Sequence, residues 1–417
     1  MLRSVSASRP PSPANPVAAF DLARLDDAFY ADPFPLYRAM RERDPVHRMP
    51  DGSLFLTRWA DLDCIYRDTR TFSSDKRAEF GAKYGDAPLF EHHTTSLVFN
   101  DPPLHTRVRR LIVGALTPRA LSTMEPGLRT LVDRLLDGLA VKGAADLIED
   151  FAAAIPIEVI GNLLDIPTEE RGPLRGWSLA ILGALEPRLT AEQEACGNEA
   201  VTEFLDYLRI LVAQRRARPG DPATDVLTRL IQGESDGERL TETELLHQCV
   251  FLLNAGHETT TNLIGNALEL LARFPDERAR LLRAPALIPT AVEEVLRYES
   301  SNQLGNRRVA EDTEIGGVAV PTGTFLTLCI GAANRDPARF EDPEHFDVGR
   351  QPNRHLAFAG GAHTCAGMNL ARIEARIALA AFLARFPDYA LTAPPVRARR
   401  ARFRGFTAMP TRLGSLR

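Results

Sequence analysis

One glycine-rich stretch decides the fold: Phe358-Ala359-Gly360-Gly361-Ala362-His363-Thr364-Cys365-Ala366-Gly367. Residues 368–379, which follow it, are mostly good helix formers. A helix that begins there directs unpaired N–H groups and the positive end of its dipole at Cys365, which favours a thiolate over a thiol. The glycines let the backbone approach a flat, bulky ligand that any Cβ would block. The stretch therefore predicts a thiolate held beside such a ligand.

Other interpretations of Cys365 stay open at this point. A single thiol is most often a buried structural cysteine. A zinc site needs further ligands at metal spacing, and the sequence contains no Cys-x-x-Cys. A nucleophilic Cys365 with His363 as its base is possible, although catalytic partners usually come from distant parts of a chain.

The composition indicates a globular enzyme. The chain has 417 residues, which suggests two domains by length alone, or one large and mainly helical enzyme. Hydrophobic residues make up 44% and charged residues 25%, which are ordinary values for a globular protein with a sizeable core. The net charge of −5 predicts no nucleic-acid partner and no binding to an anionic membrane.

The cysteines and the first residues indicate a cytoplasmic protein. Five widely spaced cysteines argue for a reducing compartment rather than a disulfide framework. No apolar stretch of about 18 residues occurs, so we expect no membrane anchor. Residues 1–16 are rich in Ser, Pro and Arg without an apolar centre, and we expect a disordered tail over residues 1–20.

The remaining chain, residues 21–417, is expected to form one catalytic domain of mainly α structure with small sheets. Apolar residues recur at helical spacing in Leu128–Leu139, Ile155–Leu164, Ala200–Ala213, Asp225–Ile231, Thr241–Phe274 and Pro289–Tyr298. Short β patterns lie at Leu54–Thr57, Glu314–Val320, Thr324–Cys329 and Phe403–Met409. Arg77–Asn100 shows no clear period and is expected to be a long loop.

The longest helical pattern carries unusual polar residues at its centre. It begins with a capping box at Thr241 and Glu244 and stops before Pro275. A glycine costs about 1 kcal/mol inside a helix, yet Gly256 lies in the middle. The Thr259 hydroxyl can bond the carbonyl of Ala255, four residues back, and loosen the helix.

The glycine-rich stretch resembles the heme-binding loop of the cytochromes P450, Phe-x-x-Gly-x-x-x-Cys-x-Gly. Phe358, Gly361, Cys365 and Gly367 occupy its fixed positions. Histidine is frequent in the family at the position that His363 occupies. Ala359 departs from the pattern, because many soluble bacterial members carry glycine there. The resemblance implies that Cys365 is the axial thiolate ligand of the iron of heme b.

The centre of the long helix resembles the oxygen-binding helix of the same family. Its segment Ala255-Gly256-His257-Glu258-Thr259 matches the family's Ala/Gly-Gly-x-Asp/Glu-Thr. The resemblance implies that Ala255 borders the heme and that Glu258 and Thr259 deliver protons to bound dioxygen. The alternative is a core helix with a purely structural role, in which the glycine allows close packing and the polar groups form hydrogen bonds within the protein.

Further matches occur in the family's order along the chain. Glu294 and Arg297 match its Glu-x-x-Arg, and Arg350 matches the arginine that completes a buried ionic cluster, which implies a structural role. The side chains that the resemblance assigns to the heme propionates are His105, Arg109, Arg307 and His355. Taken singly, each is more often a solvated side chain.

Two segments depart from these matches. Residues 300–304 differ from the family's Ser-Pro-Val-Gln, a stretch that often borders the substrate pocket, and two roles stay open for Asn302: a polar contact in the pocket or a partner for backbone groups. The basic C-terminal segment, Arg397–Arg404, is expected to be a solvated edge strand with protective charges rather than an RNA site.

The resemblance implies a helical prism enclosing heme b, with small β-sheets. It implies a monooxygenase that takes O2 and a small, mostly hydrophobic organic substrate. The chain ends soon after the heme loop, so we expect electrons from a separate ferredoxin-type donor with its reductase. A peroxygenase or an isomerase of the same fold remains an alternative. From another class, a heme-binding sensor or carrier without turnover remains open.

Overall fold

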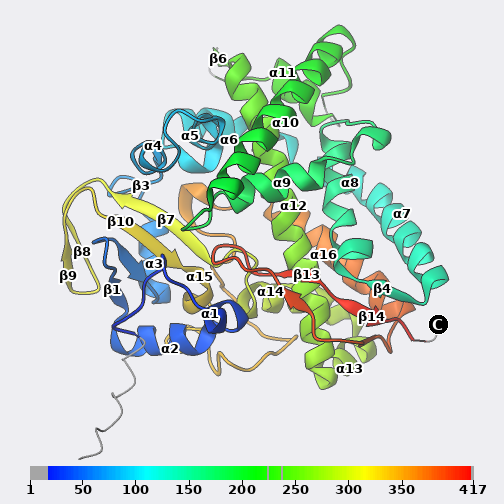
Figure 1. Cartoon of the computed structure of the whole chain (residues 1–417). Coiled ribbons are helices and arrows are strands. Elements are labelled where there is room, and N and C mark those ends of the chain that lie inside the picture. Colours follow the sequence, from blue (N-terminus) through cyan, green and yellow to red (C-terminus); the bar gives the residue numbers. More distant parts are fainter. Residues whose placement is uncertain (1–16, 223–224, 236–237, 415–417) are drawn as a thin grey trace, which may run out of the picture.

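The computed structural model describes residues 17–222, 225–235 and 238–414. Helices dominate it, and Figure 1 shows them grouped around α12. The α-helices are α1 (Asp27–Ala31), α2 (Phe34–Arg43), α3 (Trp59–Arg67), α4 (Arg77–Tyr84), α5 (Pro88–Thr95), α6 (Leu104–Ala115), α7 (Pro118–Lys142), α8 (Ala154–Leu163), α9 (Leu174–Gly183), α10 (Ala191–Ala217), α11 (Val226–Gln232), α12 (Glu242–Arg273), α13 (Pro275–Arg283), α14 (Ile288–Tyr298), α15 (Ile330–Ala333) and α16 (Met368–Arg385).

The strands are short and form small sheets, as expected. They are β1 (Val46–Arg48), β2 (Leu54–Leu56), β3 (Phe72–Ser73), β4 (Ala144–Asp146), β5 (Glu234–Ser235), β6 (Glu238–Arg239), β7 (Leu304–Val309), β8 (Thr313–Ile315), β9 (Val318–Val320), β10 (Phe325–Cys329), β11 (Ala390–Leu391), β12 (Val396–Arg397), β13 (Phe406–Ala408) and β14 (Pro410–Arg412). The largest sheet has the order β1-β2-β10-β7-β3 and is antiparallel except where β10 pairs with β2. In its register Arg307 of β7 faces Leu326 of β10.

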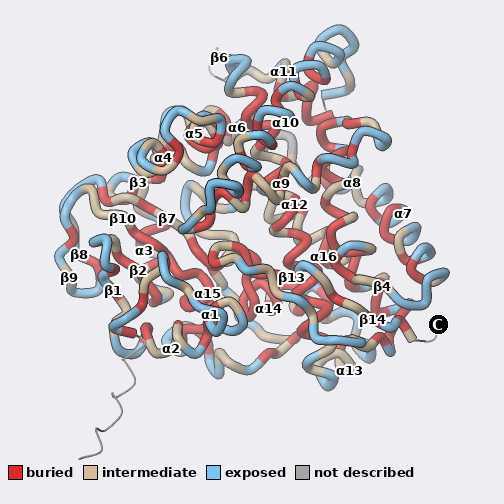
Figure 2. The backbone as a smooth tube through the Cα atoms, viewed as in Figure 1, coloured by how far each residue is buried: buried red, intermediate tan, exposed pale blue. Residues whose placement is uncertain are grey.

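Helix α12 is the central element of the fold. Its capping box is formed as the sequence predicts: the Thr241 side chain accepts from the N–H of Glu244, and the Glu244 side chain accepts from the N–H of Thr241. Neighbours pack on several sides, including α8, α9, α10, α14 and α16, and the helix is buried over most of its length (Figure 2). A helix apolar around most of its circumference belongs in such a position.

The segment from Arg77 to Asn100 is not the long loop that the sequence predicts. It forms α4 and α5, with Phe80 and Tyr84 buried one turn apart. The helices are short, and the histidines and threonines of α5 obscure their apolar period. Local signals are nevertheless present, because Gly85 ends α4 at φ +58° and Pro88 opens α5.

The N-terminal prediction is partly wrong. Residues 1–16 lie outside the described residues. Val17 and Phe20, by contrast, are buried in an aromatic cluster with Phe29, Tyr37 and Phe55, so the expected tail of residues 1–20 does not extend to Phe20. In the part of the chain that the structure describes, no helix combines the length and the apolar character needed to cross a membrane.

Candidate functional site

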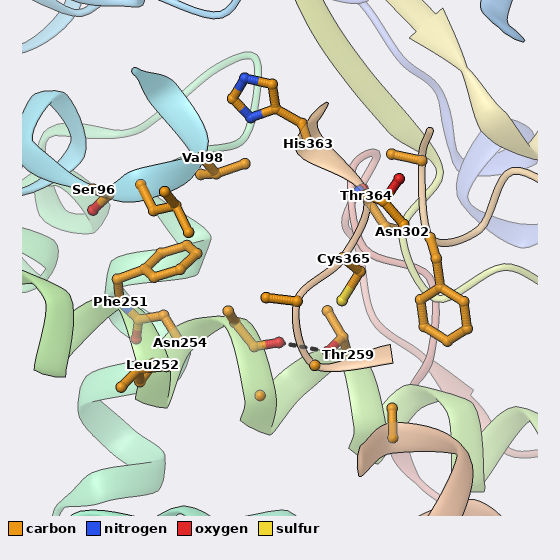
Figure 3. Close-up of a pocket in the computed structure, with 18 of the residues that line it drawn as sticks. Ser96, Val98, Phe251, Leu252, Asn254, Thr259, Asn302, His363, Thr364 and Cys365 are labelled. Atoms are coloured by element: carbon orange, nitrogen blue, oxygen red, sulfur yellow. Dashed lines mark hydrogen bonds between the residues drawn. The ribbon is translucent and has the colours of Figure 1, made fainter. Parts of the chain in front are cut away.

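A cavity of about 330 Å³ lies between α12 and the loop that carries Cys365. Figure 3 shows Thr259 and Asn254 on α12, and His363, Thr364 and Cys365 on the loop. Segments far apart in sequence contribute to its wall, among them α5, α6, β7 and the basic C-terminal segment. Most of the lining side chains are apolar, so the cavity suits a large hydrophobic ligand.

The predicted site residues divide into two groups. Those that line the cavity are His105, Arg109, Ala255, Thr259, Arg307, Phe358, His363, Cys365 and Gly367. The predicted cofactor and catalytic residues that do not line it are Glu258, His355 and Gly361. The ionic cluster of Glu294, Arg297 and Arg350 is a separate structure beneath the site.

The backbone of the Cys365 loop is bent in a way that needs its glycines. Gly361 has φ +63°, and a Cβ there would lie 2.1 Å from the carbonyl oxygen of Tyr66. Ala359 also has a positive φ, +55°, which explains why glycine suits this position better. The N–H of Cys365 donates to the carbonyl of Phe358 at 3.0 Å and closes the loop.

Cys365 is deep in the protein but exposed toward the cavity. Burial raises the pKa of its thiol, while the N–H of Gly367 and the charges of Arg109 and Arg372 oppose this shift. The preference for a thiolate that the sequence predicts from the helix N-terminus is therefore outweighed by burial. A bound metal ion would favour the thiolate.

The zinc and nucleophile interpretations of Cys365 gain no support. Among the described residues, no group of three or more His, Cys, Asp or Glu side chains could hold a metal ion. His363 makes no hydrogen bond to Cys365. Its ring instead lies 4.0 Å from the ring of His105, and burial lowers its pKa to about 2.

Several nitrogen atoms beside Cys365 are buried without a hydrogen-bond partner. They are Nε2 of His105, Nε2 of His363, and Nε and Nη2 of Arg307, as judged over residues 17–222, 225–235 and 238–414. Arg109 is nearby and donates from Nη2 to the carbonyl of Thr364 at 2.6 Å. A buried guanidinium with two unsatisfied nitrogens is costly, so these donors fit an anionic ligand.

His355 does not belong to this set, because it does not line the cavity, and its contact with the cofactor stays a prediction. Its Nε2 lies 3.2 Å from a carboxylate oxygen of Glu293, and its Nδ1 accepts from the N–H of Ala357. Glu293 also binds Arg372 through two hydrogen bonds of 2.7 and 2.8 Å. Both ring nitrogens of His355 are thus engaged in holding the start of the loop.

On α12, Thr259 reaches the cavity and makes the hydrogen bond that the sequence predicts. Its hydroxyl donates to the carbonyl of Ala255 at 2.7 Å, drawn as the dashed line in Figure 3. Gly256 has a packing role as well, because a Cβ there would lie 2.6 Å from Cδ1 of Ile160 on α8. Thr260 also lines the cavity, a contact that the sequence argument missed.

Glu258 points away from the cavity, toward the basic C-terminal segment. Its Oε2 lies 2.5 Å from Nη1 of Arg400, whose Nη2 donates to the carbonyl of Leu179. Burial raises the pKa of Glu258 to about 7, and the charge of Arg400 limits the rise. The side chain therefore exchanges its proton near neutral pH.

Glu374 is a site residue that sequence reasoning missed. It lies on α16, lines the cavity, and its Oε2 has no partner in the described part of the chain. Burial raises its pKa to about 8. The signal in the sequence was a lone glutamate on an otherwise apolar helix face, two turns after Cys365.

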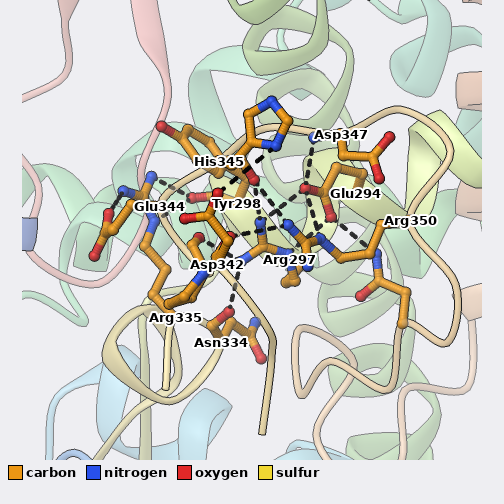
Figure 4. A network of polar contacts seen from close by, with 12 residues as sticks. Glu294, Arg297, Tyr298, Asn334, Arg335, Asp342, Glu344, His345, Asp347 and Arg350 are labelled. Carbon is orange, nitrogen blue, oxygen red and sulfur yellow. Dashed lines mark hydrogen bonds and ion pairs between the residues drawn. The ribbon is translucent and has the colours of Figure 1, made fainter. Parts of the chain in front are cut away.

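Glu294, Arg297 and Arg350 do come together, as predicted. Arg297 donates twice to the Glu294 carboxylate, at 2.7 and 2.8 Å, and Arg350 donates to it at 3.2 Å. Carbonyl oxygens between Asn334 and His345 take the remaining donors of both arginines (Figure 4). Neither Glu294 nor Arg297 has any exposed surface, so each charge depends on the other.

The basic C-terminal segment is not the solvated edge strand that the sequence predicts. Arg400 binds Glu258, Arg402 lines the cavity, and Arg404 and Arg397 bind the buried carboxylate of Glu299. Four arginines therefore point inward, because carboxylates and carbonyl oxygens inside the protein bind their guanidinium groups. Arg399 is the exception: it stays exposed and pairs with Asp27.

Comparison with known proteins agrees with this geometry. The family model "Cytochrome P450" matches residues 187–284 and 286–395. Cytochrome P450 107B1 of Saccharopolyspora erythraea is 38% identical over 95% of this chain and 98% of its own length. The vitamin D(3) 25-hydroxylase of Pseudonocardia autotrophica is 36% identical over 93% of this chain and 95% of its own length.

A solved structure gives the same result for the fold. The crystal structure of P450BioI in complex with hexadec-9Z-enoic acid ligated acyl carrier protein matches with a TM-score of 0.88 and 33% identity. The match covers 93% of this chain and 100% of that chain. With the cysteine loop, the long polar-centred helix and the buried Glu–Arg cluster all in place, the chain belongs to the cytochrome P450 family.

Proposed function

We propose that this chain inserts one oxygen atom of O2 into a small, mostly hydrophobic organic substrate, using electrons from a ferredoxin-type donor with its reductase. As a cytochrome P450, the chain is an oxidoreductase that binds heme b and acts with O2, a small molecule and a redox partner. The observation that carries the proposal is Cys365, exposed toward an apolar cavity that Thr259 enters from the opposite wall.

The residues around the cavity fit heme b. Cys365 would supply the axial thiolate. The unsatisfied nitrogens of His105, Arg307 and His363, together with Arg109, would hold the two propionates. When bound, heme b supplies an iron centre at which O2 is reduced, and thiolate ligation favours cleavage of the O–O bond.

Thr259 and Glu258 are the proposed route for protons. The Thr259 hydroxyl donates to Ala255, which leaves its oxygen free to accept a hydrogen bond from a group in the cavity. The pKa of Glu258, about 7, lets its Oε2 gain and lose a proton at working pH. Because Oε2 is paired with Arg400 and the side chain does not line the cavity, Glu258 has to pass its proton from the other carboxyl oxygen or turn away from Arg400 to reach Thr259.

The experiment measures product, electrons and oxygen together. Holoprotein, ferredoxin, reductase and NADPH are incubated with a panel of hydrophobic compounds under 18O2. We expect product that carries one labelled oxygen atom and forms only when reductant is present. Equal turnover without reductant would indicate an isomerase. Equal turnover with hydrogen peroxide as the only oxidant would indicate a peroxygenase. Binding of compounds without any product would indicate a sensor or carrier.

The ligation is tested separately by spectroscopy. Reduced wild-type protein with carbon monoxide should show the strongly red-shifted absorption of thiolate-ligated heme. Cys365→His should move the band to the position of a histidine-ligated heme. An unchanged band in Cys365→Ala would refute the assignment of Cys365.

A further inference from the structure

In the part of the chain that the structure describes, three arginines line the cavity, and one of them has no part in the heme site proposed above. They are Arg109, Arg307 and Arg402. In the proposed heme site, the two negatively charged propionates would pair with the positive charges of Arg109 and Arg307. Glu374 is the acid that lines the cavity, and burial raises its pKa to about 8, so it is mostly neutral. Arg402 is left without a counter-charge.

The protein holds Arg402 in place but does not pair it with a carboxylate. Its Nη1 donates to the carbonyl of Leu304 at 3.0 Å and its Nε to that of Leu185 at 3.4 Å. Its own carbonyl accepts from the N–H of Gln303 at 2.8 Å. Over the described ranges, Nη2 has no hydrogen-bond partner and the guanidinium has no ion pair. Two carbonyl oxygens thus orient the side chain, and the N–H groups of Nη2 remain available to a ligand.

The acid near Arg402 does not neutralise it. The carboxylate of Glu186 accepts from the backbone N–H groups of Ala401 and Arg402, at 2.7 and 3.2 Å. A second cation, Lys83, shares this neighbourhood and is held by the carbonyls of Ala184 and Glu186. Further charges are nearby, because Lys76 pairs with Glu79 and Lys83 lies near Glu79, Glu186 and Glu194. Within the described ranges, none of these carboxylates forms a hydrogen bond or an ion pair with the guanidinium of Arg402, whose side-chain partners are two carbonyl oxygens.

We propose that Arg402 binds a carboxylate of the substrate, so that the substrate is a monocarboxylic acid with an apolar body. The inference rests on the proposed function and adds the substrate class to it. A guanidinium edge presents parallel N–H donors to the two oxygens of a carboxylate. One unpaired guanidinium can pair with one carboxylate of the substrate. The apolar walls, which include Phe251 and Leu252, would contact the apolar body of the molecule.

The test compares acids with their own methyl esters. Ferric holoprotein is titrated at about pH 7.5, where carboxylic acids are ionised, with linear, cyclic and aromatic monocarboxylic acids and the ester of each. Binding is measured by equilibrium dialysis and by the heme spectral shift. An ester buries one methyl group more than its acid, so apolar burial alone would favour the ester. We expect the best acid to bind at least about 10-fold more tightly than its ester.

Variants of Arg402 locate the effect. Arg402→Gln should weaken binding of that acid about 10- to 100-fold, the usual loss for a hydrogen bond to a charged group, and leave the ester unchanged. Arg402→Lys keeps the charge and should retain the preference for the acid. Arg399→Gln, an exposed neighbour paired with Asp27, is the matched control and should bind like wild type.

The outcomes separate this inference from the proposed function. Acids that bind no better than their esters to wild-type holoprotein, including no binding of either, would overturn it. An acid preference that survives in Arg402→Gln would overturn the role of Arg402. Both results are compatible with an intact thiolate–heme spectrum and reductant-dependent turnover of neutral compounds, so the proposed function could stand while the inference fails. If Arg402→Gln does not fold, the wild-type comparison and Arg402→Lys still decide.

Discussion

Oε2 of Glu258 lies 2.5 Å from Nη1 of Arg400, although 142 residues separate them in sequence. The carboxyl is buried within α12, and the guanidinium comes from the C-terminal segment that packs over it. The ion pair lowers the cost of burying the acid but does not remove it, because the pKa of Glu258 is still raised to about 7. This balance leads to the first prediction.

Glu258→Gln should change how stability depends on pH. The folded-state pKa of Glu258, about 7, lies above its ordinary value of 4.5. Its favourable contribution is therefore fully present below pH 4.5 and is lost as the pH rises through 7. Relative to Glu258→Gln, the wild type should lose roughly 3 kcal/mol of unfolding free energy between those limits. Urea unfolding of both proteins from pH 5 to 8 measures this, and a constant difference would contradict it.

Thr259→Ala should separate electron consumption from product formation. The variant loses the hydroxyl but keeps Cys365 and the apolar walls, so substrate binding and heme reduction should survive. Product per electron should fall and hydrogen peroxide should rise. Thr259→Ser retains the hydroxyl and is the control, a better one than Thr260→Ala because Thr260 also lines the cavity.

Glu258→Gln should act on turnover differently from Thr259→Ala. Removing the ionisable group should lower the whole rate, by roughly 10²-fold, without the same rise in peroxide. Cofactor oxidation, peroxide and product are measured together in each variant. Normal coupling in Thr259→Ala would show that protons reach the cavity by another group, and Glu374 would then be the first to examine.

Glu294→Ala should destabilise the protein and weaken heme retention. It leaves Arg297 buried without its carboxylate, at a cost of roughly 3–5 kcal/mol. The matched control is Glu125→Ala, which removes the exposed partner of Arg129 and should cost at most about 1 kcal/mol. Denaturant unfolding and the heme-to-protein absorbance ratio report both effects. Equal losses of unfolding free energy in the two variants would mean that the buried cluster stabilises the protein no more than a surface ion pair does.

Ala359→Gly should stabilise the cysteine loop. An L-residue at φ +55° costs about 1–2 kcal/mol, and part of the gain is offset by the greater freedom of glycine in the unfolded chain. The net gain should be roughly 0.5–1 kcal/mol in unfolding free energy. Gly361→Ala is the reciprocal test: its Cβ would meet the Tyr66 carbonyl, so holoprotein yield should fall. A less stable Ala359→Gly would show that the alanine side chain contributes packing that exceeds its backbone strain.

Short-range patterns predicted the parts of the site that lie on one segment. The cysteine loop, the capping box at Thr241 and the hydrogen bond from Thr259 to Ala255 all depend on residues within about ten positions of each other. The pairing of Glu294 with Arg297 is of the same kind, since three residues separate them on α14. Local spacing was sufficient for these features.

Contacts between distant segments could not be predicted in this way. Nothing near Arg400 or Arg402 in sequence shows that one meets a buried glutamate and the other a cavity. An arginine-rich run has the composition of a solvated strand, and only the packed fold supplies inward partners. The partner of His355 was likewise not predicted: it lies close to the loop in sequence, but its Nε2 faces a carboxylate oxygen of Glu293, 62 residues away.

The position of the basic C-terminal segment also sets the order of assembly during synthesis. Arg404 donates to the carbonyls of Tyr30 and Ala31, so it binds residues that are synthesised more than 370 positions before it. Until residues 400–404 emerge from the ribosome, Glu258 lacks its hydrogen-bond partner Arg400, and the cavity lacks the wall that carries Arg402 and Phe403. A nascent chain held short of residue 400 therefore presents a cavity that lacks the part of its wall formed by Arg402 and Phe403.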